Sequence, residues 1–416
     1  MLVLPTATYR ATAFLRAAAA LGIECVIASD EPPTLAARME GRVLTLDLGR
    51  PDQAAERAAD FARRWPVDAI VGVDEASVLA AAHVATCLGL ARNPLEAVAA
   101  TRDKRRLRAL LSAAAVPQPE WVGARADASG SAARAAADRV GLPCVVKPVD
   151  LTASRGVIRA DSVEDLATAI ARLDKLLHRP ELCGAGGDRP LLVEGFVAGA
   201  EVAIEGLLRE GELWVLAVFD KPDPLDGPFF AETLFVTPSR HHPAVIRQAV
   251  AIAGRAVAAI GLRDGPVHAE LRLTPAGPVF LEVAARSIGG RCSSVLRLVD
   301  GAAEMSLEEV LLRHACGLPL DRPRLAPGAA GVLMLEVPAA GVLRAVSGIS
   351  DAAAVEGVTA VDITIAPGQR VEPLPEGHRY LGFVVARAAD ASSAEAALRE
   401  AGGRIAVEIS PDPESR

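Results

Sequence analysis

A predicted hairpin in the last third of the chain constrains the fold more than any other feature of the sequence. Residues 268–274 alternate polar and apolar side chains, a pattern typical of a strand with one buried face. Residues 275–278 read Pro-Ala-Gly-Pro and predict a turn, and residues 279–283 predict the return strand. Two adjacent antiparallel strands are therefore expected, with one polar and one apolar face.

The loop length decides which side chains oppose each other. A three-residue loop at 275–277 would pair Thr274 with Pro278. Counting back from that pair places Glu270 directly opposite Glu282, with the two side chains roughly 5 Å apart. The other face is then expected to be core, formed by Leu271, Leu273, Leu281 and Val283.

Two opposed carboxylates repel each other and need a compensating charge. A divalent cation is one candidate, because Mg²⁺ binds few carboxylates together with phosphate oxygens. The alternative is a pair of solvated surface glutamates screened by His268 or Arg272. Arg286 follows Glu282 by four residues, and an arginine leaving such a strand can bind a phosphate or carboxylate through two hydrogen bonds.

The rest of the chain divides into regions of different pattern. Residues 1–94 alternate strand and helix patterns, which predicts a βαβ unit with a parallel sheet. Tyr9-Arg10 and Asp74-Glu75 fall at the carboxyl ends of its strands, where such sheets usually bind ligands, although a purely structural layer is equally compatible. Residues 326–416 predict a small α+β unit of strands and one helix.

Composition excludes several classes of protein. A formal net charge of -8 without a basic block argues against nucleic-acid binding. We find no apolar run approaching the roughly 18 residues that cross a bilayer, and residues 1–5 lack the basic start of a signal peptide. The six cysteines form no Cys-x-x-Cys pair, which predicts reduced thiols in a cytoplasmic protein.

Lysine is rare enough to be informative. Of 44 basic residues only four are lysine: Lys104, Lys147, Lys175 and Lys221. An ammonium is a compact point charge that arginine does not readily replace beside a phosphate. We therefore expect the lysines to include phosphate-binding residues, with Lys175 a solvated charge on a helix.

The run Glu-x-x-x-Arg-x-x-Gly-Gly, which begins at Glu282 and is preceded by His268-x-Glu270, resembles the ATP-grasp superfamily. Within that superfamily it is most similar to the L-amino acid ligases, which join two amino acids into a dipeptide. The resemblance extends in order from Asp103-Lys104 to Gly290. Segments after residue 330 are similar to the C-terminal cap of the same ligases.

The resemblance implies a role for each matching residue. ATP phosphates would meet Lys104, Lys147, Lys221 and the flexible loop with Ser154 and Gly156, and the adenosine would meet Glu194, Val197 and Glu201. Glu270 and Glu282 would bind Mg²⁺, as one or two ions that Mn²⁺ can replace, and Arg286 would be catalytic. Substrate contacts are expected at Glu232, His268, Ser287, Gly289 and Gly290, with Phe229, Phe230 and Phe235 as further candidates for the pocket lining.

The expected protein is an α/β and α+β multidomain ligase. The resemblance implies an N-terminal βαβ domain (1–94), an ATP-grasp domain (95–325) with a mobile lid at about 117–193, and a C-terminal α+β cap (326–416). It implies formation of an amide bond through an acyl phosphate, with ADP and phosphate released. The resemblance also implies small carboxylate and amine substrates and a homodimer, and no nucleic-acid or membrane partner is expected.

The sequence departs from the family pattern at two places, and two alternative functions stay open. Ala284 stands where many relatives have a metal-binding asparagine, and the loop 150–156 has fewer glycines than usual. The alternatives are a biotin-carboxylase-like or purine-pathway ligase, and a nucleotide-binding protein without turnover.

Overall fold

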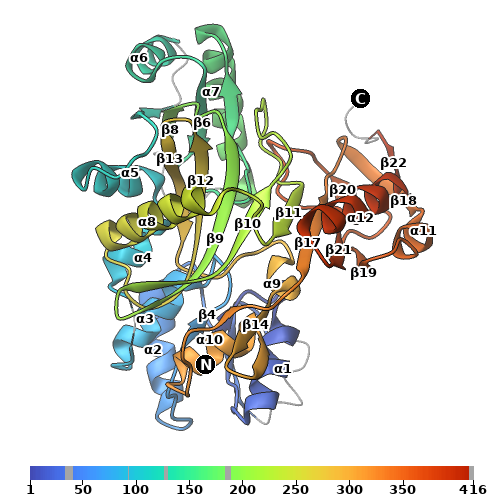
Figure 1. The fold of residues 1–416 in the computed structure, drawn as a ribbon. Coiled ribbons are helices and arrows are strands. Elements are labelled where there is room, and N and C mark those ends of the chain that lie inside the picture. The colour runs from blue at the N-terminus through green and yellow to red at the C-terminus, as the bar shows by residue number, and fades with distance from the viewer. Residues whose placement is uncertain (33–40, 92, 126–129, 183–188, 412–416) are drawn as a thin grey trace.

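The structure is a computed structural model that describes residues 1–32, 41–91, 93–125, 130–182 and 189–411. Some residues therefore lie outside the described part of the chain. They include Cys183, most of the glycine-rich stretch at residues 180–190, and the residues after Pro411. Figure 1 shows three masses: the N-terminal elements below, the helices α6 and α7 above, and the last strands and α12 at the right. The mixed α/β multidomain fold expected from the sequence is confirmed.

The N-terminal elements form a four-stranded parallel sheet in the order β3-β2-β1-β4. Helices cover it, with α1 and α10 on one face and α2 and α3 on the other. This is the parallel βαβ arrangement that the sequence predicted, although β3 and α2 were not foreseen. The elements are β1 (Leu2–Leu4), α1 (Ala11–Leu21), β2 (Ile27–Ser29), β3 (Val43–Thr45), α2 (Pro51–Ala62), β4 (Val71–Gly72) and α3 (Val78–Cys87).

Two helices lead into the region that the resemblance predicts to be a lid, which keeps that name here. It is a four-stranded antiparallel sheet in the order β5-β8-β6-β7. Helices α6 and α7 pack on this sheet through an aliphatic cluster that contains Leu166 and Leu173. The elements are α4 (Leu95–Thr101), α5 (Lys104–Ala113), β5 (Trp121–Arg125), α6 (Ser131–Val140), β6 (Cys144–Pro148), β7 (Ile158–Ala160), α7 (Val163–Leu177), the 3-10 helix η2 (Pro180–Leu182) and β8 (Pro190–Gly195).

An eight-stranded antiparallel sheet in the order β13-β12-β9-β10-β11-β17-β21-β19 forms the centre of the molecule. Its strands come from both sides of residue 325, so the C-terminal region continues the central sheet. Helix α8 packs on one end and α12 on the other. The elements are β9 (Ala200–Arg209), β10 (Glu212–Lys221), β11 (Leu234–Thr237), α8 (Pro243–Ile260), β12 (Gly265–Thr274), β13 (Gly277–Ala284), β17 (Ala329–Leu335), β19 (Val358–Ile363), β21 (Gly382–Ala388) and α12 (Ala391–Gly403).

Two small sheets complete the fold. The first, in the order β15-β14-β16, lies beside α10, which packs against the N-terminal helix α1. The second has the order β20-β18-β22. The elements are α9 (Cys292–Val295), β14 (Arg297–Asp300), β15 (Ala303–Ser306), α10 (Leu307–Ala315), β16 (Arg324–Leu325), β18 (Gly341–Ser347), α11 (Ile349–Ala353), β20 (Arg370–Val371) and β22 (Ala406–Ser410).

The β12–β13 hairpin keeps the predicted carboxylate pair by a different route. Thr274 pairs with Gly277, so the loop has two residues and the predicted three-residue loop is wrong. Gly277 has a φ of +119°, which a glycine adopts without strain and which permits the tighter turn. A bulge at Leu281 then shifts the register by one residue and restores Glu270 opposite Glu282.

The same bulge changes which side chains form the core. Phe280 is fully buried in place of Leu281, whose side chain lines a cavity. Leu271 and Val283 are buried as expected, whereas Leu273 is only half-buried at the edge of the core. The core therefore contains an aromatic ring that the alternating pattern assigned to the polar face.

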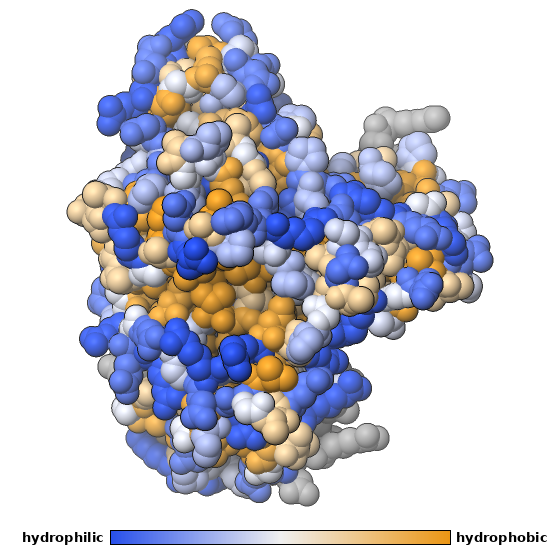
Figure 2. Space-filling model, viewed as in Figure 1, coloured by the Kyte–Doolittle hydropathy of each residue, from blue (hydrophilic) through white to orange (hydrophobic). Residues whose placement is uncertain are grey.

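Helix α8 is long and apolar on average, although Arg247 and Arg255 interrupt its apolar sequence. Within the described residues it is the one helix whose 18 residues are long and apolar enough to cross a membrane, by length and composition alone. Ala249, Ala253 and Val257 are buried on its inner side, which packs against β12 and β13. On the face drawn in Figure 2, hydrophobic surface gathers over the central strands, and the C-terminal region at the right mixes hydrophilic and hydrophobic residues.

Candidate active site

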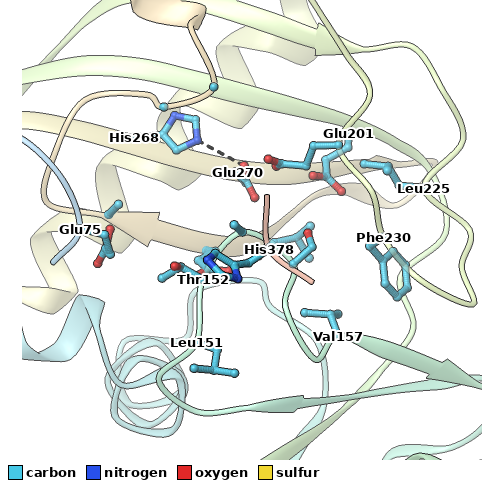
Figure 3. Close-up of a pocket in the computed structure, with 18 of the residues that line it drawn as sticks. Glu75, Leu151, Thr152, Val157, Glu201, Leu225, Phe230, His268, Glu270 and His378 are labelled. Atoms are coloured by element: carbon cyan, nitrogen blue, oxygen red, sulfur yellow. Dashed lines mark hydrogen bonds and ion pairs between the residues drawn. The ribbon is translucent and has the colours of Figure 1, made fainter. Parts of the chain in front are cut away.

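One cavity of about 770 Å³ collects residues from every part of the fold. Its walls come from the lid, the β12–β13 hairpin, the carboxyl ends of the N-terminal strands and the segment before β21. Figure 3 shows His268 directed at Glu270 with Glu201 nearby, while Thr152 and His378 lie across the cavity. The expected site residues that line it are Lys104, Lys147, Ser154, Glu194, Val197, Glu201, Glu232, His268, Glu270, Glu282, Arg286, Gly289 and Gly290.

Four expected residues do not line this cavity: Gly156, Lys221, Phe229 and Ser287. Lys221 and Ser287 are buried behind its wall, 5% and 2% exposed. Gly156 lies in the β6–β7 loop, where its φ is +75° and a Cβ would come within 2.8 Å of Pro148. Phe230 and Phe235 line the cavity, whereas Phe229 lines a neighbouring one of about 380 Å³.

The Lys104 ammonium compensates one of the two opposed carboxylates. Its Nζ lies 3.1 Å from Glu282 Oε1 and donates to the Leu151 carbonyl oxygen at 2.6 Å. Asp103 caps α5 by accepting hydrogen bonds from Arg105 N and Arg106 N, which fixes Lys104 in the first turn of the helix. This lysine therefore joins the carboxylate strand to the loop of the lid.

Lys221 compensates the other carboxylate and two more. Its Nζ lies 2.7 Å from Glu201, 2.7 Å from Glu232 and 2.8 Å from Glu270. Burial alone would lower the pKa of Lys221, but the three carboxylates raise it well above its usual value. In this structure the ammonium neutralises carboxylates, and its expected contact with phosphates stays a prediction.

Glu194 is held by two cations instead of facing the cavity alone. Arg108 Nε lies 2.6 Å from Oε1 and Lys147 Nζ lies 2.7 Å from Oε2. Burial alone would raise the pKa of the Glu194 carboxyl, but the two cations lower it to about 2. Arg108 also donates to the Leu281 carbonyl at 2.6 Å, beside the bulge. An adenine contact of Glu194 stays a prediction.

His268 bridges a buried carboxylate and Glu270. Its Nε2 lies 3.2 Å from Glu270 Oε1, and its Nδ1 lies 3.5 Å from Glu205 Oε2. Burial alone would lower the pKa of His268, but the neighbouring Glu205 and Glu270 carboxylates raise it to about 9. The imidazolium therefore carries positive charge beside the carboxylate pair at neutral pH.

Arg286 faces a carboxylate from the N-terminal sheet. Its Nε lies 2.9 Å from Glu75 Oε2, and both side chains are less than one fifth exposed. Glu75 follows β4 and Arg286 follows β13, so the pair joins two regions at the cavity wall. The next residue, Ser287, accepts a hydrogen bond from Arg10 Nη2 at 2.8 Å, and this interaction holds the arginine segment from behind.

Comparison with known proteins identifies the fold around this cavity. Residues 140–295 match the family profile of the ATP-grasp domain, residues 333–410 that of the L-amino acid ligase C-terminal domain 2, and residues 15–91 that of the ATP-grasp N-terminal domain. The crystal structure of an L-amino acid ligase from Bacillus licheniformis superposes with a TM-score of 0.83 at 22% identity, covering 98% of both chains.

This chain is an ATP-grasp protein with an L-amino acid ligase C-terminal domain.

Two proteins are similar in sequence to this ATP-grasp protein over part of their length. An uncharacterised protein of Sinorhizobium fredii, y4rH, is 28% identical over 309 residues, which is 74% of this chain and 61% of that protein. The alanine–anticapsin ligase of Bacillus subtilis is 26% identical over 290 residues, which is 66% of this chain and 59% of that ligase. The matches thus span about three fifths of the length of these relatives.

The donor set of the ATP-grasp site fits a metal ion that binds together with phosphate. Glu270 and Glu282 are opposed on one strand pair and both line the cavity. Across the part of the chain that is described, no group of three His, Cys, Asp or Glu side chains could hold an ion on its own. Mg²⁺ commonly binds one or two carboxylates and takes its other ligands from water and substrate phosphates, and a pair of carboxylates is compatible with this mode of binding.

Sequence reasoning missed several residues of the ATP-grasp site. Arg108 and Glu205 were not singled out, although Glu205 is an isolated carboxylate in an otherwise apolar stretch of β9. Glu205 is fully buried and accepts a hydrogen bond from Ile288 N at 2.9 Å. His378, Arg379 and Tyr380 reach the cavity from the C-terminal region, and no local motif marks them.

Proposed function

We propose that this protein is an ATP-dependent ligase that joins a carboxylate to an amine through an acyl phosphate, with release of ADP and phosphate. The substrates are two amino acids, or an amino acid and a small carboxylate. One observation carries the proposal: the opposed pair Glu270 and Glu282 shares a single cavity with Arg286, Lys104 and Lys147. That cavity combines groups for phosphates with a cation for a carboxylate.

The phosphate end of ATP would lie between the lid loop and the hairpin. Lys104 and Lys147 can release their present carboxylate partners and neutralise phosphate oxygens. A divalent ion on Glu270 and Glu282, when bound, would screen the charge of the transferring phosphoryl group. Phosphoryl transfer needs chiefly positioning and charge neutralisation, which are the properties of this set of residues.

The opposite charges of Arg286 and Glu75 are complementary to the carboxylate and the ammonium of an α-amino acid. The guanidinium can bind the substrate carboxylate through two hydrogen bonds, and the Glu75 carboxylate can accept from an ammonium. This supports an amino acid as one substrate, as does the name of the relative, alanine–anticapsin ligase. Arg286 would then stabilise the oxyanion that develops when the amine attacks.

Atoms balance over two steps. A carboxylate oxygen attacks the γ-phosphorus and ADP leaves. The amine nitrogen then forms the bond to the acyl carbon, inorganic phosphate leaves, and the amine gives up one proton. Water must be excluded between the steps, because it would otherwise hydrolyse the acyl phosphate.

The test is a screen of amino acid pairs with Mg²⁺ and ATP, in which phosphate release is measured and the product is detected by mass. Phosphate and ADP should form in equal amounts with an amide, and only when both substrates are present. Formation of AMP and pyrophosphate would refute the mechanism. Product from bicarbonate or a ribosylamine, with none from amino acids, would refute the substrate class.

A further inference from the structure

Residues 372–380 of the C-terminal region contact the lid through ion pairs and hydrogen bonds. This clasp segment lies between β20 and β21. Glu372 accepts from Arg179 Nη1 at 2.6 Å and from Nη2 at 3.2 Å. Glu376 accepts from Arg172 Nε at 2.5 Å and from Nη2 at 2.8 Å. Both arginines belong to the lid, on α7 and just after it, so two bidentate ion pairs join the lid to the C-terminal region.

The backbone carbonyls of the clasp segment also accept hydrogen bonds from the loop between β6 and β7. Gly156 N donates to the Pro375 carbonyl at 2.9 Å, and Arg155 Nε donates to the Glu376 carbonyl at 2.8 Å. Ser154, two residues earlier, lines the catalytic cavity. The ion pairs and these hydrogen bonds therefore act on the segment that the proposed function places over the ATP phosphates.

The other end of the clasp segment enters the cavity itself. His378, Arg379 and Tyr380 line it, and Figure 3 shows His378 on the same side as Thr152 of the loop. A displacement of the clasp segment would therefore open the cavity from two sides. The loop would lose its backbone partners, and the wall formed by these three residues would move with it.

We propose that Glu372 and Glu376 are positioning residues that hold the phosphate loop closed while the acyl phosphate exists. The proposal rests on the proposed function and adds to it a device that limits hydrolysis of the intermediate. Neither carboxylate touches a reacting atom; each acts through an arginine of the lid. The C-terminal region thereby takes part in the reaction without supplying a catalytic group.

The strength of the clasp suits a contact that opens in every cycle. The side chains of the pairs are 21% to 45% exposed, so solvent and salt screen them partly. Pairs of this kind contribute modestly, and two of them together correspond to roughly a three- to tenfold preference for the closed loop. Such a preference favours the closed loop and still lets it open to release product.

The experiment compares wild type with the double variant Glu372→Gln/Glu376→Gln. Glu400→Gln is the matched control, since Glu400 pairs with Arg404 at the end of α12 and not with the lid. Amide exchange of the peptide covering residues 150–157 is measured with a non-hydrolysable ATP analogue. Phosphate released per amide formed is measured with ATP and substrates.

We expect about three- to tenfold faster exchange of that peptide in the double variant, and a phosphate-to-amide ratio that rises from near one. The control should match wild type in both. Unchanged exchange in the double variant would overturn the proposal whatever the substrates are. Faster exchange with a ratio that stays near one would overturn the protective role.

A charge exchange separates positioning from a general loss of structure. Arg179→Glu and Glu372→Arg should each speed exchange of the 150–157 peptide, and combining them should restore slow exchange. Failure of the combination to restore it, with both single variants folded, would contradict the pairing as the cause. The variants could speed exchange of the 150–157 peptide as expected while wild type forms no amide from any pair of substrates. In that case the proposed ligase function fails, but the role of the clasp segment in holding the loop is retained.

Discussion

Lys221 offers the sharpest test of the charge arrangement in the site. Replacing it by methionine keeps most of the aliphatic stem and removes the ammonium that holds Glu201, Glu232 and Glu270. The side chains concerned are 3%, 8%, 22% and 18% exposed, for Lys221 and the three glutamates in that order. Solvent therefore offers little compensation for the lost charge.

The magnitude follows from which carboxylates keep another partner. Glu201 retains Arg272 at 2.9 Å, and Glu270 retains His268 at 3.2 Å. Glu232 has no second ion pair in the described part of the chain. Breaking a buried pair costs about 3–5 kcal/mol, and with one carboxylate fully abandoned we expect about 3 kcal/mol of lost unfolding free energy.

Urea denaturation at pH 7 measures this loss, with Lys175→Met as the control because Lys175 is exposed on α7. The control should change the unfolding free energy by less than about 0.5 kcal/mol. The deficit of Lys221→Met should shrink as the pH falls from about 8 to 5, because protonation of the abandoned carboxylates relieves their repulsion. A variant as stable as the control at pH 8 would refute the reasoning.

Three further predictions follow from the site. Arg286→Ala should retain ATP binding by calorimetry while the rate of amide formation falls by about 10²- to 10³-fold, and normal ligation would contradict the role of Arg286. Glu282→Gln should raise the Mg²⁺ concentration for half-maximal phosphate release by at least about tenfold, whereas an unchanged requirement would remove Glu282 from the metal site. Because the pKa of Glu194 is lowered to about 2, its stabilising contribution of roughly 3 kcal/mol should be complete above about pH 4.5 and disappear as the pH falls through about 2. Urea midpoints of wild type should therefore fall more steeply across that window than those of Glu194→Gln, and parallel profiles would contradict the ion pairs of Glu194.

The hairpin shows how far local pattern carries. Alternation and turn chemistry predicted two strands and the Glu270–Glu282 pair, and the pair forms. The loop length and the bulge were not readable, because one glycine tolerates several turns and a bulge leaves no mark in the pattern. Two register errors cancelled, one at the turn and one at Leu281.

The partners of the charged residues depend on pairing between distant strands. The family resemblance implied that Lys221 meets phosphates, and the rarity of lysine supported that prediction. Its place among three carboxylates follows from β9, β10 and β12 lying side by side, with Glu232 on the segment before β11. The spacing of these residues along the chain does not predict that arrangement.

The clasp segment is invisible to the sequence for a similar reason. Glu372 and Glu376 lie about 190 to 200 residues from Arg179 and Arg172, and each looks like an ordinary surface charge. Sequence motifs identify residues that lie close together in the chain and bind one ligand. They do not mark contacts that bring two regions together.

The central claim is amide formation through an acyl phosphate, and product stoichiometry tests it most directly. With Mg²⁺, ATP and a productive pair of substrates in which the carboxylate is labelled with ¹⁸O, each amide should form together with one ADP and one phosphate. One ¹⁸O atom should pass from the carboxylate into that phosphate, because the acyl oxygen attacks the γ-phosphorus. Unlabelled phosphate, or release of AMP and pyrophosphate, would contradict the mechanism.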